Sequence, residues 1–236
     1  GTQQAVTILE KMFPDAKIER ADLDTTQRKK QWQQTMKDFH AGNIDILVGT
    51  QTITKGYHFP KVTLVGVLWA DLNLHFPIFN AAETSLQQLI QVAGRAGRQS
   101  DDSLVIVQAM DDHKIFQYLD ETLYLKFYQN ELETRSIINY PPVQRLVEIE
   151  LKHTNEFIIE REAHDLGITL QHHATRMKKQ IQILGPAKPP VHKIKNTFSR
   201  KIYLKSAQIQ DIILIYKLVD LNQYQCAIYF TPNPVT

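Results

Sequence analysis

The sequence predicts an α/β domain with a parallel sheet, followed by a smaller α+β domain. Up to about residue 109, short apolar runs alternate with segments of helical periodicity, the pattern of strands joined by right-handed helical crossovers. The stretch Asn139-Tyr140-Pro141-Pro142 then ends a helical segment, because proline cannot continue a helix. Beyond this stretch the predicted order becomes β-α-β-β-α-β, which is the split βαβ or ferredoxin-like order.

The spacing of apolar residues places the individual elements of both domains. In the first domain we expect helices over residues 6–13, 28–39 and 81–92, and strands over 16–23, 44–48, 62–68 and 104–108. A long helix is expected over 112–132. In the second domain we expect strands over 146–151, 181–184, 201–205 and 226–230, and helices over 156–177 and 209–221. The predicted division is residues 1–111, a helical linker over 112–140, and residues 141–236.

The composition excludes several classes of protein. Of the 236 residues, 43% are hydrophobic and 22% are charged, which is ordinary for a globular protein. No apolar run approaches the roughly 20 residues that span a bilayer, so no membrane association is expected. The net charge of +2 is too small to indicate a nucleic-acid protein by itself. The single cysteine, Cys226, excludes an internal disulfide and fits a reducing compartment. Because the chain starts at Gly1 without a signal-peptide pattern, we expect an excised piece of a longer protein.

The stretch QVAGRAGR, residues 91–98, places Arg95 and Arg98 three positions apart among glycines. Glycine lets the backbone approach a ligand closely, and the guanidinium fork matches a phosphate and stays charged. The two arginines are therefore candidates for stabilising charge on a transferring phosphoryl group. A structural pair that bridges surface carboxylates is equally compatible with this stretch alone.

The stretch ILVGTQTITKGYHFP, residues 46–60, favours the first interpretation. It runs from a predicted buried strand into Thr50 and Gln51, and open α/β sheets bind their ligands at the carboxyl ends of their strands. Lys55 and Gly56 follow in a loop that offers backbone amides and one cation to phosphates. By itself this motif is better explained as a turn with a surface lysine. Two such motifs beside strands of one sheet indicate a phosphate ligand.

The two stretches together are similar to motifs V and VI of superfamily 2 helicases. The run GTQTITKGYHFPKVTLVGVLWADLNLHFPIFNAAE, followed by QVAGRAGR, resembles the second motor lobe of the bacterial replication-restart DNA helicases. GTQQAVTILEKMFP and ADLDTTQRKK resemble upstream segments of that lobe, and INYPPVQRL, ILGPAKPPVHKIKN and RKIYLKS resemble the family's linker and C-terminal domain. The resemblance covers the whole chain and implies a RecA-like lobe. Tyr57-His58, Thr84 and the terminal YFTPNP depart from the family's pattern, but both motor motifs are intact.

The resemblance also implies roles for individual residues. Arg98 would be the arginine finger, Arg95 would reach the ATP phosphates beside it, and Gly56 would contribute to nucleotide binding. Gln91 would couple the nucleotide to the acidic motif of the other lobe. The DNA-facing edge would comprise Thr50, Gln51, Lys55, Gly1 and Thr2. ATP with Mg²⁺ would be held mostly by the family's first lobe, because this chain has no G-x-x-x-x-G-K-[ST] loop. The family's zinc module would also lie outside this chain, and we expect no zinc ligands within it.

Outside the motor motifs, basic residues gather in the second domain at Lys188, His192, Lys193, Lys195, Arg200 and Lys201. Such residues in a loop can follow a phosphate backbone, and Phe198 can stack on a base. We take Lys193, Lys195, Phe198 and Arg200 as candidate DNA contacts; a solvated loop is the alternative. Asp71 either orients an arginine or is a strand-end carboxylate in water. The histidines show no metal-ligand spacing, so we predict no metal site.

The sequence therefore predicts the C-terminal half of an ATP-dependent DNA helicase. By the resemblance it translocates 3′ to 5′ and acts at stalled forks in replication restart and primosome assembly. The expected partners are single-stranded and forked DNA, primosome proteins and single-stranded-DNA-binding protein, in the bacterial cytoplasm near the nucleoid. We expect a monomer, and a chain that does not hydrolyse ATP unaided. The alternatives are a non-enzymatic nucleic-acid-binding module and the second lobe of another superfamily 2 translocase.

Overall fold

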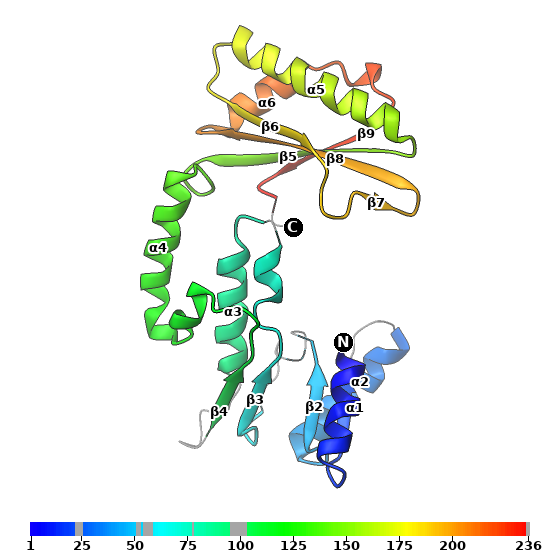
Figure 1. Ribbon diagram of the computed structural model, residues 1–236, viewed down its shortest axis with the longest axis vertical. Helices are drawn as coiled ribbons and strands as arrows, with labels where there is room; N and C mark the ends of the chain where they lie inside the picture. The colour runs from blue at the N-terminus through cyan, green and yellow to red at the C-terminus, as the bar shows by residue number, and fades with distance from the viewer. Residues whose placement is uncertain (22–25, 51–52, 54–58, 77, 95–102, 235–236) are drawn as a thin grey trace. The chain divides into compact units, whose positions relative to one another are not determined.

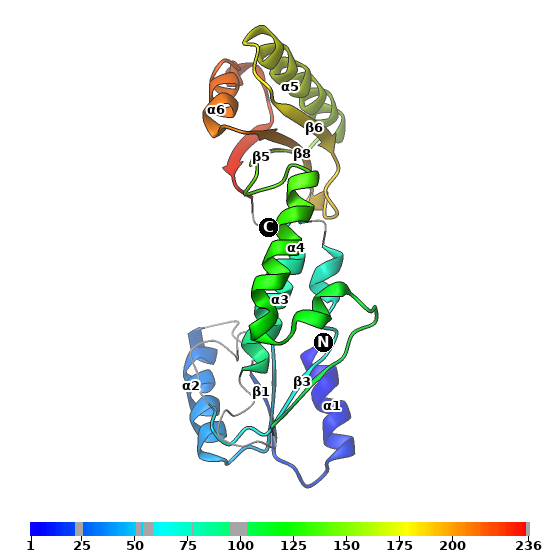
Figure 2. The same cartoon turned by 90° about the vertical axis from the view of Figure 1, so that its left-hand side faces the viewer.

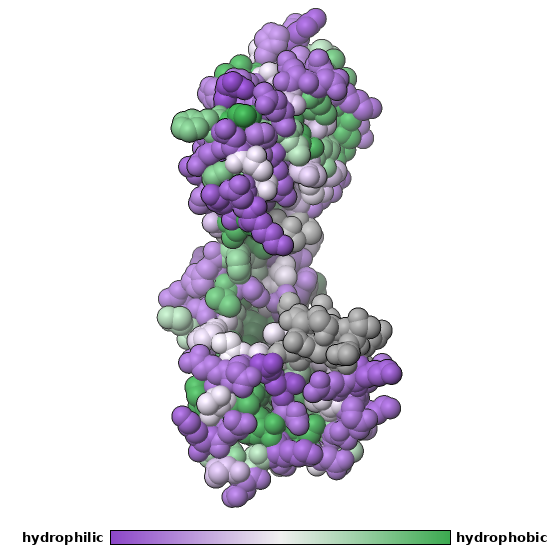
Figure 3. Space-filling view, turned by 90° about the vertical axis from the view of Figure 1, so that its right-hand side faces the viewer, coloured by the Kyte–Doolittle hydropathy of each residue, from purple (hydrophilic) through white to green (hydrophobic). Residues whose placement is uncertain are grey.

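A computed structural model describes residues 1–21, 26–50, 53, 59–76, 78–94 and 103–234 (Figure 1). It divides into two compact units, Gly1–Phe127 and Tyr128–Thr236, and each is described by itself. No helix in the described part of the chain is long and apolar enough to cross a bilayer. On the face drawn in Figure 3, hydrophilic residues cover most of the second unit.

The first half of the first unit is a parallel strand pair flanked by helices. Strands β1 (Ile18–Ala21) and β2 (Ile46–Gly49) pair in parallel, and α2 (Thr26–Ala41) makes the crossover that parallel pairing requires. Helix α1 (Thr2–Met12) packs against both strands, and Figure 2 shows α1 and α2 on opposite sides of the pair. The core comprises the buried side chains of Ala21, Trp32, Met36 and Phe59.

The second half of the first unit repeats this plan. Strands β3 (Leu64–Val67) and β4 (Leu104–Val107) pair in parallel, and α3 (Ala81–Ala93) lies between them in the chain. Leu86 and Leu89 of α3 are buried with Ile115, Tyr118 and Phe127. The prediction of an α/β first domain with parallel pairing is confirmed, but among the described residues its four strands form two separate pairs rather than the single sheet expected.

Residues 112–132 do not form the single long helix that the sequence predicted. Two short 3₁₀ turns, η3 (Lys114–Tyr118) and η4 (Glu121–Leu123), precede α4 (Tyr124–Ile137). The side chain of Asp120 accepts a hydrogen bond from the Thr122 backbone N–H at 2.8 Å. Local bonds of this kind compete with those of a continuous helix, and they interrupt the expected one.

The second unit is an antiparallel sheet covered on one face by two helices (Figure 1). The strands are β5 (Arg145–His153), β6 (Gln182–Ala187), β8 (Thr197–Ser206) and β9 (Ala227–Pro232), with the short β7 (Lys193–Ile194) beside β8. The spatial order is β6-β8-β5-β9, and all neighbours are antiparallel. Helices α5 (Glu156–Arg176) and α6 (Ile209–Lys217) and the short turn η5 (Leu221–Gln223) belong to the unit, together with α4 from Tyr128 onward. The predicted β-α-β-β-α-β order is present, with β7 as an addition.

Two strands of the second unit, β6 and β8, are longer than predicted. Strand β6 continues through Gly185-Pro186 with an irregular register, where a loop was expected, and β8 begins at Thr197 rather than at residue 201. Gly185 has φ +102°, and a Cβ there would lie 2.7 Å from the Lys201 backbone oxygen. Glycine satisfies both constraints and lets β6 pass β8 at this close approach.

Candidate functional site

Helix α3 leads directly into the arginine motif. Its apolar face is fixed by Leu86 and Leu89, which are 0% and 5% exposed. Gln91 lies in the last turn with its side chain exposed, and α3 ends at Ala93 with Gly94 as its C-cap. Arg95 and Arg98 lie outside the described residues. The structure therefore describes the helix that carries the arginine motif, and the roles of the two arginines stay predictions.

The second motif begins where β2 ends. Thr50 is exposed and directly follows Gly49, the last residue of β2, so it stands at the carboxyl end of the strand as the sequence predicted. Gly49 is required there, because a Cβ would lie 2.6 Å from Ile53 Cγ2 and 2.9 Å from the Ala21 backbone oxygen. Gln51, Lys55, Gly56 and Tyr57 lie outside the described residues.

The predicted motif IV residues begin helix α1. Gly1 is the N-cap and Thr2 the first helical residue, and no side chain caps this end or places a negative charge in the first turn. Arg20 of β1 donates a hydrogen bond from Nη1 to Gln3 Oε1 at 2.6 Å. This bond ties the first turn of α1 to the strand pair. Backbone amides of an uncapped first turn favour anions such as phosphate.

The predicted basic loop of the second unit is a β-hairpin. Lys193 pairs with Phe198 and Ile194 with Thr197, which leaves Lys195-Asn196 as a two-residue turn with φ of 45° and 63°. Positive φ at both positions characterises a type I′ turn. Lys193 and Lys195 are exposed, and within the described part of the chain no ion pair is found for either. Phe198 is partly buried, with Lys193 Nζ 4.5 Å above its ring.

Arg200 is placed differently from the prediction. It is 1% exposed, and its guanidinium donates hydrogen bonds to Glu156 at 3.0 Å and to Glu160 at 2.9 Å. Its Nη1 also donates to the Ser199 backbone oxygen at 2.7 Å. The Arg200 hydrogen bond holds the pKa of Glu160 below its usual value, with burial acting in the opposite direction. The group therefore clamps β8 to α5 and is not available to a DNA phosphate.

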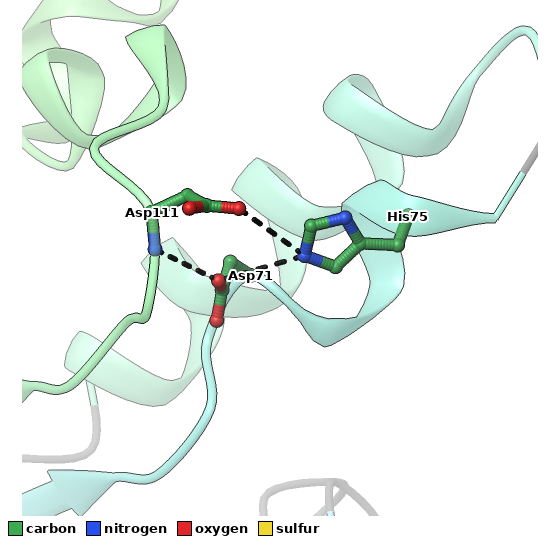
Figure 4. Close-up of side chains that lie close together, drawn as sticks. All are labelled: Asp71, His75 and Asp111. Atoms are coloured by element: carbon green, nitrogen blue, oxygen red, sulfur yellow. Dashed lines mark hydrogen bonds and ion pairs between the residues drawn. The ribbon is translucent and has the colours of Figure 1, made fainter.

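Asp71 belongs to a cluster that the sequence did not reveal (Figure 4). Asp71 is 3% exposed, and its Oδ2 accepts hydrogen bonds from the backbone N–H groups of Met110 and Asp111, both at 3.1 Å. His75 Nε2 lies 3.6 Å from the same oxygen and 3.7 Å from Asp111 Oδ2. Burial raises the pKa of Asp71, but the hydrogen bonds from the backbone N–H groups of Asp111 and Met110 act against burial, and the pKa is lower than usual.

This placement corrects one of the two interpretations of Asp71, because the carboxylate is buried rather than in water. Its side-chain partner among the described residues is a histidine. The i, i+4 spacing of Asp71 and His75 is visible in the sequence. The third residue, Asp111, lies 40 positions after Asp71 and becomes a neighbour only when β3 and β4 pair.

Comparison with known proteins identifies the kind of domain that carries these motifs. Residues 2–100 match the family described as the helicase conserved C-terminal domain. The first unit therefore contains the C-terminal, RecA-like domain of a helicase.

The whole chain is similar to one particular helicase. It is 36% identical to replication restart protein PriA of Bacillus subtilis over 99% of its length, 34% identical to PriA of Synechocystis over 91%, and 36% identical to PriA of Treponema pallidum over 87%. The chain thus matches the C-terminal region of PriA, a superfamily 2 helicase. It spans 26% to 31% of the length of these relatives.

Proposed function

We propose that this chain is the second motor lobe and C-terminal domain of an ATP-dependent DNA helicase that acts in replication restart. The observation that carries the proposal is the continuous similarity to PriA over 99% of the chain, which includes the intact QVAGRAGR stretch at the end of α3. The helicase would translocate 3′ to 5′ on single-stranded DNA at stalled forks. Closure of two lobes around the nucleotide would drive each step.

The nucleotide site would lie between this lobe and an upstream lobe that supplies the phosphate loop and the Mg²⁺ ligands. Arg98 would be the arginine finger, Arg95 would bind the phosphates beside it, and Gly56 would line the same site. Gln91, exposed in the last turn of α3, would couple the nucleotide to the upstream lobe. Because α3 is anchored through Leu86 and Leu89, it can transmit a movement of the phosphates as a rigid element.

DNA would contact the edge formed by the carboxyl end of β2 and the start of α1. Thr50 is exposed at this strand end, and Gln51 and Lys55 follow it in the chain. Gly1 and Thr2 begin a helix whose first turn has no side-chain cap, which supports a contact with backbone phosphates. These contacts would not depend on the base sequence, as translocation requires.

The second unit would be a ferredoxin-like domain that adds a further DNA contact. Numbered along the chain without β7, its strands lie in the order 2-3-1-4 with antiparallel neighbours, and this order supports the assignment. The contact would be the β7–β8 hairpin with Lys193 and Lys195, beside Phe198. Arg200 is not included, because its guanidinium is buried against Glu156 and Glu160.

The cellular role would follow that of PriA. We propose that forked DNA, single-stranded-DNA-binding protein and primosome proteins are the partners of the complete helicase, which would act as a monomer near the bacterial nucleoid. Residues 112–140 would connect the motor lobe to the C-terminal domain. Any zinc of the complete helicase would belong to its upstream region.

The proposal is tested by DNA-stimulated ATP hydrolysis of the chain alone and of the helicase with its upstream region restored. We expect no activity from the chain alone. In the restored helicase, Arg98→Ala should lower turnover by about 10³-fold or more, as in other phosphoryl-transfer systems with an arginine finger. ATP binding should be retained, because the upstream lobe would hold most of the nucleotide.

Arg176→Ala is the matched control, because Arg176 is an exposed arginine in the last turn of α5. It should leave ATP turnover unchanged. Normal turnover by the Arg98→Ala helicase would refute the assigned mechanism. A restored protein that binds DNA but hydrolyses no ATP, with or without DNA, would favour the non-enzymatic binding module.

A further inference from the structure

The carboxyl ends of β3 and β4 bring three metal-ligating side chains together. Asp71 comes from the turn after β3, His75 from the 3₁₀ turn η2 (Leu72–His75), and Asp111 from the segment after β4. Figure 4 shows Nε2 of His75 directed at both carboxylates, while its Nδ1 faces away. In the described part of the chain this is the one group of three such ligands.

The distances within this cluster exceed those of hydrogen bonds. His75 Nε2 lies 3.6 Å from Asp71 Oδ2 and 3.7 Å from Asp111 Oδ2, whereas N–H···O bonds span about 2.7–3.2 Å. Ligand atoms on a tetrahedral zinc ion with bonds of about 2.1 Å lie about 3.4 Å apart. The observed separations are within a few tenths of an ångström of that value. One ring nitrogen facing two oxygens at this spacing matches a shared cation better than a pair of hydrogen bonds.

The residues around the cluster hold its ligands in place. The Asp71 carboxylate is fixed by the backbone N–H groups of Met110 and Asp111, and such second contacts orient a metal ligand. Asn73 of η2 donates to Gln88 Oε1 of α3 at 3.1 Å, which fixes the turn that carries His75.

We propose that Asp71, His75 and Asp111 form a binding site for a divalent transition-metal ion such as Zn²⁺. One imidazole and two carboxylates suit Zn²⁺ better than Mg²⁺ or Ca²⁺, which prefer oxygen ligands alone. His75 and Asp111 are exposed, with side chains 60% and 71% accessible, so the ion has a direct entry path and water completes its coordination. The proposal does not depend on the proposed helicase activity.

Metal binding would brace the carboxyl ends of β3 and β4 against α3. Asp71 and Asp111 extend from neighbouring parallel strands, and His75 lies in the turn that contacts α3. An ion held by all three would fix the exits of β3 and β4 relative to that helix. We therefore expect the ion to stabilise the first unit rather than to take part in the chemistry.

The test is a titration of the metal-free 236-residue chain with ZnCl₂, monitored by calorimetry. A parallel titration with CoCl₂ reports the type of ligand through the absorption spectrum of the bound ion. The expected result is one Zn²⁺ per chain and a rise of about 5–10 °C in the unfolding temperature of the first unit at a free concentration 100-fold above Kd. His75→Gln and Asp111→Asn should each weaken binding at least about 10-fold. MgCl₂ should produce neither effect.

His172→Gln is the matched control, because His172 is an exposed histidine of α5 whose ring lies 5.7 Å from that of the half-buried His173, so the pair is a competing source of imidazole ligands. This variant should bind Zn²⁺ like the parent chain. Equal losses in the His75→Gln and His172→Gln chains, or unchanged binding by both His75→Gln and Asp111→Asn, would overturn the assignment. Far-UV circular dichroism before metal addition establishes that each variant is folded.

Discussion

Replacing Arg200 by methionine separates a structural role from DNA binding. The sequence made Arg200 a candidate DNA contact, whereas the structure buries its guanidinium against Glu156 and Glu160 of α5. Methionine keeps an apolar stem of similar length but cannot donate a hydrogen bond. The variant therefore removes the clamp between β8 and α5 while retaining most of the packing.

The expected cost follows from the bonds that are lost. Arg200 donates to Glu156, to Glu160 and to the Ser199 backbone oxygen. A buried hydrogen bond to a charged group contributes about 1.5–3 kcal/mol, but the two carboxylates are 42% and 47% exposed, so water replaces much of the loss. The Ser199 oxygen, in contrast, loses a partner inside the protein. Together these effects should reduce the free energy of unfolding of the second unit by about 2–3 kcal/mol.

Both tryptophans, Trp32 and Trp69, lie in the first unit, so tryptophan fluorescence does not report on unfolding of the second unit. Hydrogen exchange of individual amides measures the loss of stability there instead. Slowly exchanging amides of β8 and α5 should exchange about 30- to 140-fold faster in Arg200→Met, since about 1.4 kcal/mol corresponds to a factor of ten. Affinity for a single-stranded oligonucleotide, measured by fluorescence anisotropy below the unfolding transition, should stay within a factor of two of the parent's.

Lys195→Met is the matched control at the exposed turn of the hairpin. It should leave exchange in β8 unchanged and should weaken oligonucleotide binding and reduce its salt dependence, as loss of one phosphate contact does. The reasoning is refuted if Arg200→Met leaves β8 exchange unchanged and instead lowers DNA affinity.

The clamp also has a defined pH dependence. The Arg200 hydrogen bond lowers the pKa of Glu160 in the folded state. The Arg200–Glu160 contact therefore stabilises the second unit fully at pH values above the unfolded-state pKa of glutamate, about 4.3. This stabilisation is lost as the pH falls through the folded-state pKa of Glu160. The difference in the free energy of unfolding between the parent and Arg200→Met chains should therefore be largest at pH 6 and should decrease below about pH 4.

Three further predictions concern packing. Gly49→Ala should destabilise the first unit by about 1–3 kcal/mol in urea, because the new Cβ would lie 2.6 Å from Ile53 Cγ2; Gly66→Ala, with nothing within 4 Å, is the control, and equal tryptophan-fluorescence transitions for both would contradict this. Leu166→Ala, at a fully buried position, should cost the second unit about 2–5 kcal/mol by hydrogen exchange. Burial raises the pKa of the Cys226 thiol to about 12, so Ellman's reagent should react slowly until denaturant is added, and rapid reaction of the native chain would disprove the burial.

Elements with regular apolar spacing were predicted well because that spacing records burial. In α5, the positions Ile159, Ala163, Leu166 and Leu170 are all 0% exposed, and they recur every three or four residues in the sequence. The same signal located α3 and the four strands of the first unit. It also gave the β-α-β-β-α-β order, because α5, α6 and the strands β5, β6, β8 and β9 all contribute apolar side chains to a single core.

The helix expected over 112–132 fails for a local reason. The aromatic residues Tyr118 and Phe127 are buried, but apolar spacing does not distinguish one helix from two short turns and a helix. His113 and Asp120 each accept a hydrogen bond from the backbone N–H two residues later. Asp120 followed by Thr122 was the available sequence signal, because aspartate favours such turns.

Arg200 shows how an error in a strand boundary becomes an error in function. Side chains two positions apart in a strand share a face, and Ile202 and Leu204 are both 0% exposed. A strand beginning at residue 197 therefore turns Arg200 toward the core, whereas the predicted strand began at 201 and left Arg200 in a loop. Lys193 and Lys195 were predicted to contact DNA on the same ground, a basic side chain in a loop. Both lysines are exposed, so this prediction stands and is tested by oligonucleotide binding.

The Asp71, His75 and Asp111 cluster follows from strand register, which the sequence does not state. Val67 of β3 pairs with Val107 of β4, so residues at equal offsets beyond these positions leave the sheet side by side. Asp71 and Asp111 both lie four positions beyond this pair, and His75 returns to them through a 3₁₀ turn. Parallel pairing in this register thus brings Asp71 and Asp111, 40 residues apart in the sequence, next to each other at the carboxyl ends of β3 and β4. Shifting the register by two residues would separate the two carboxylates by about 6–7 Å along the strands, so zinc binding also tests the pairing of β3 with β4.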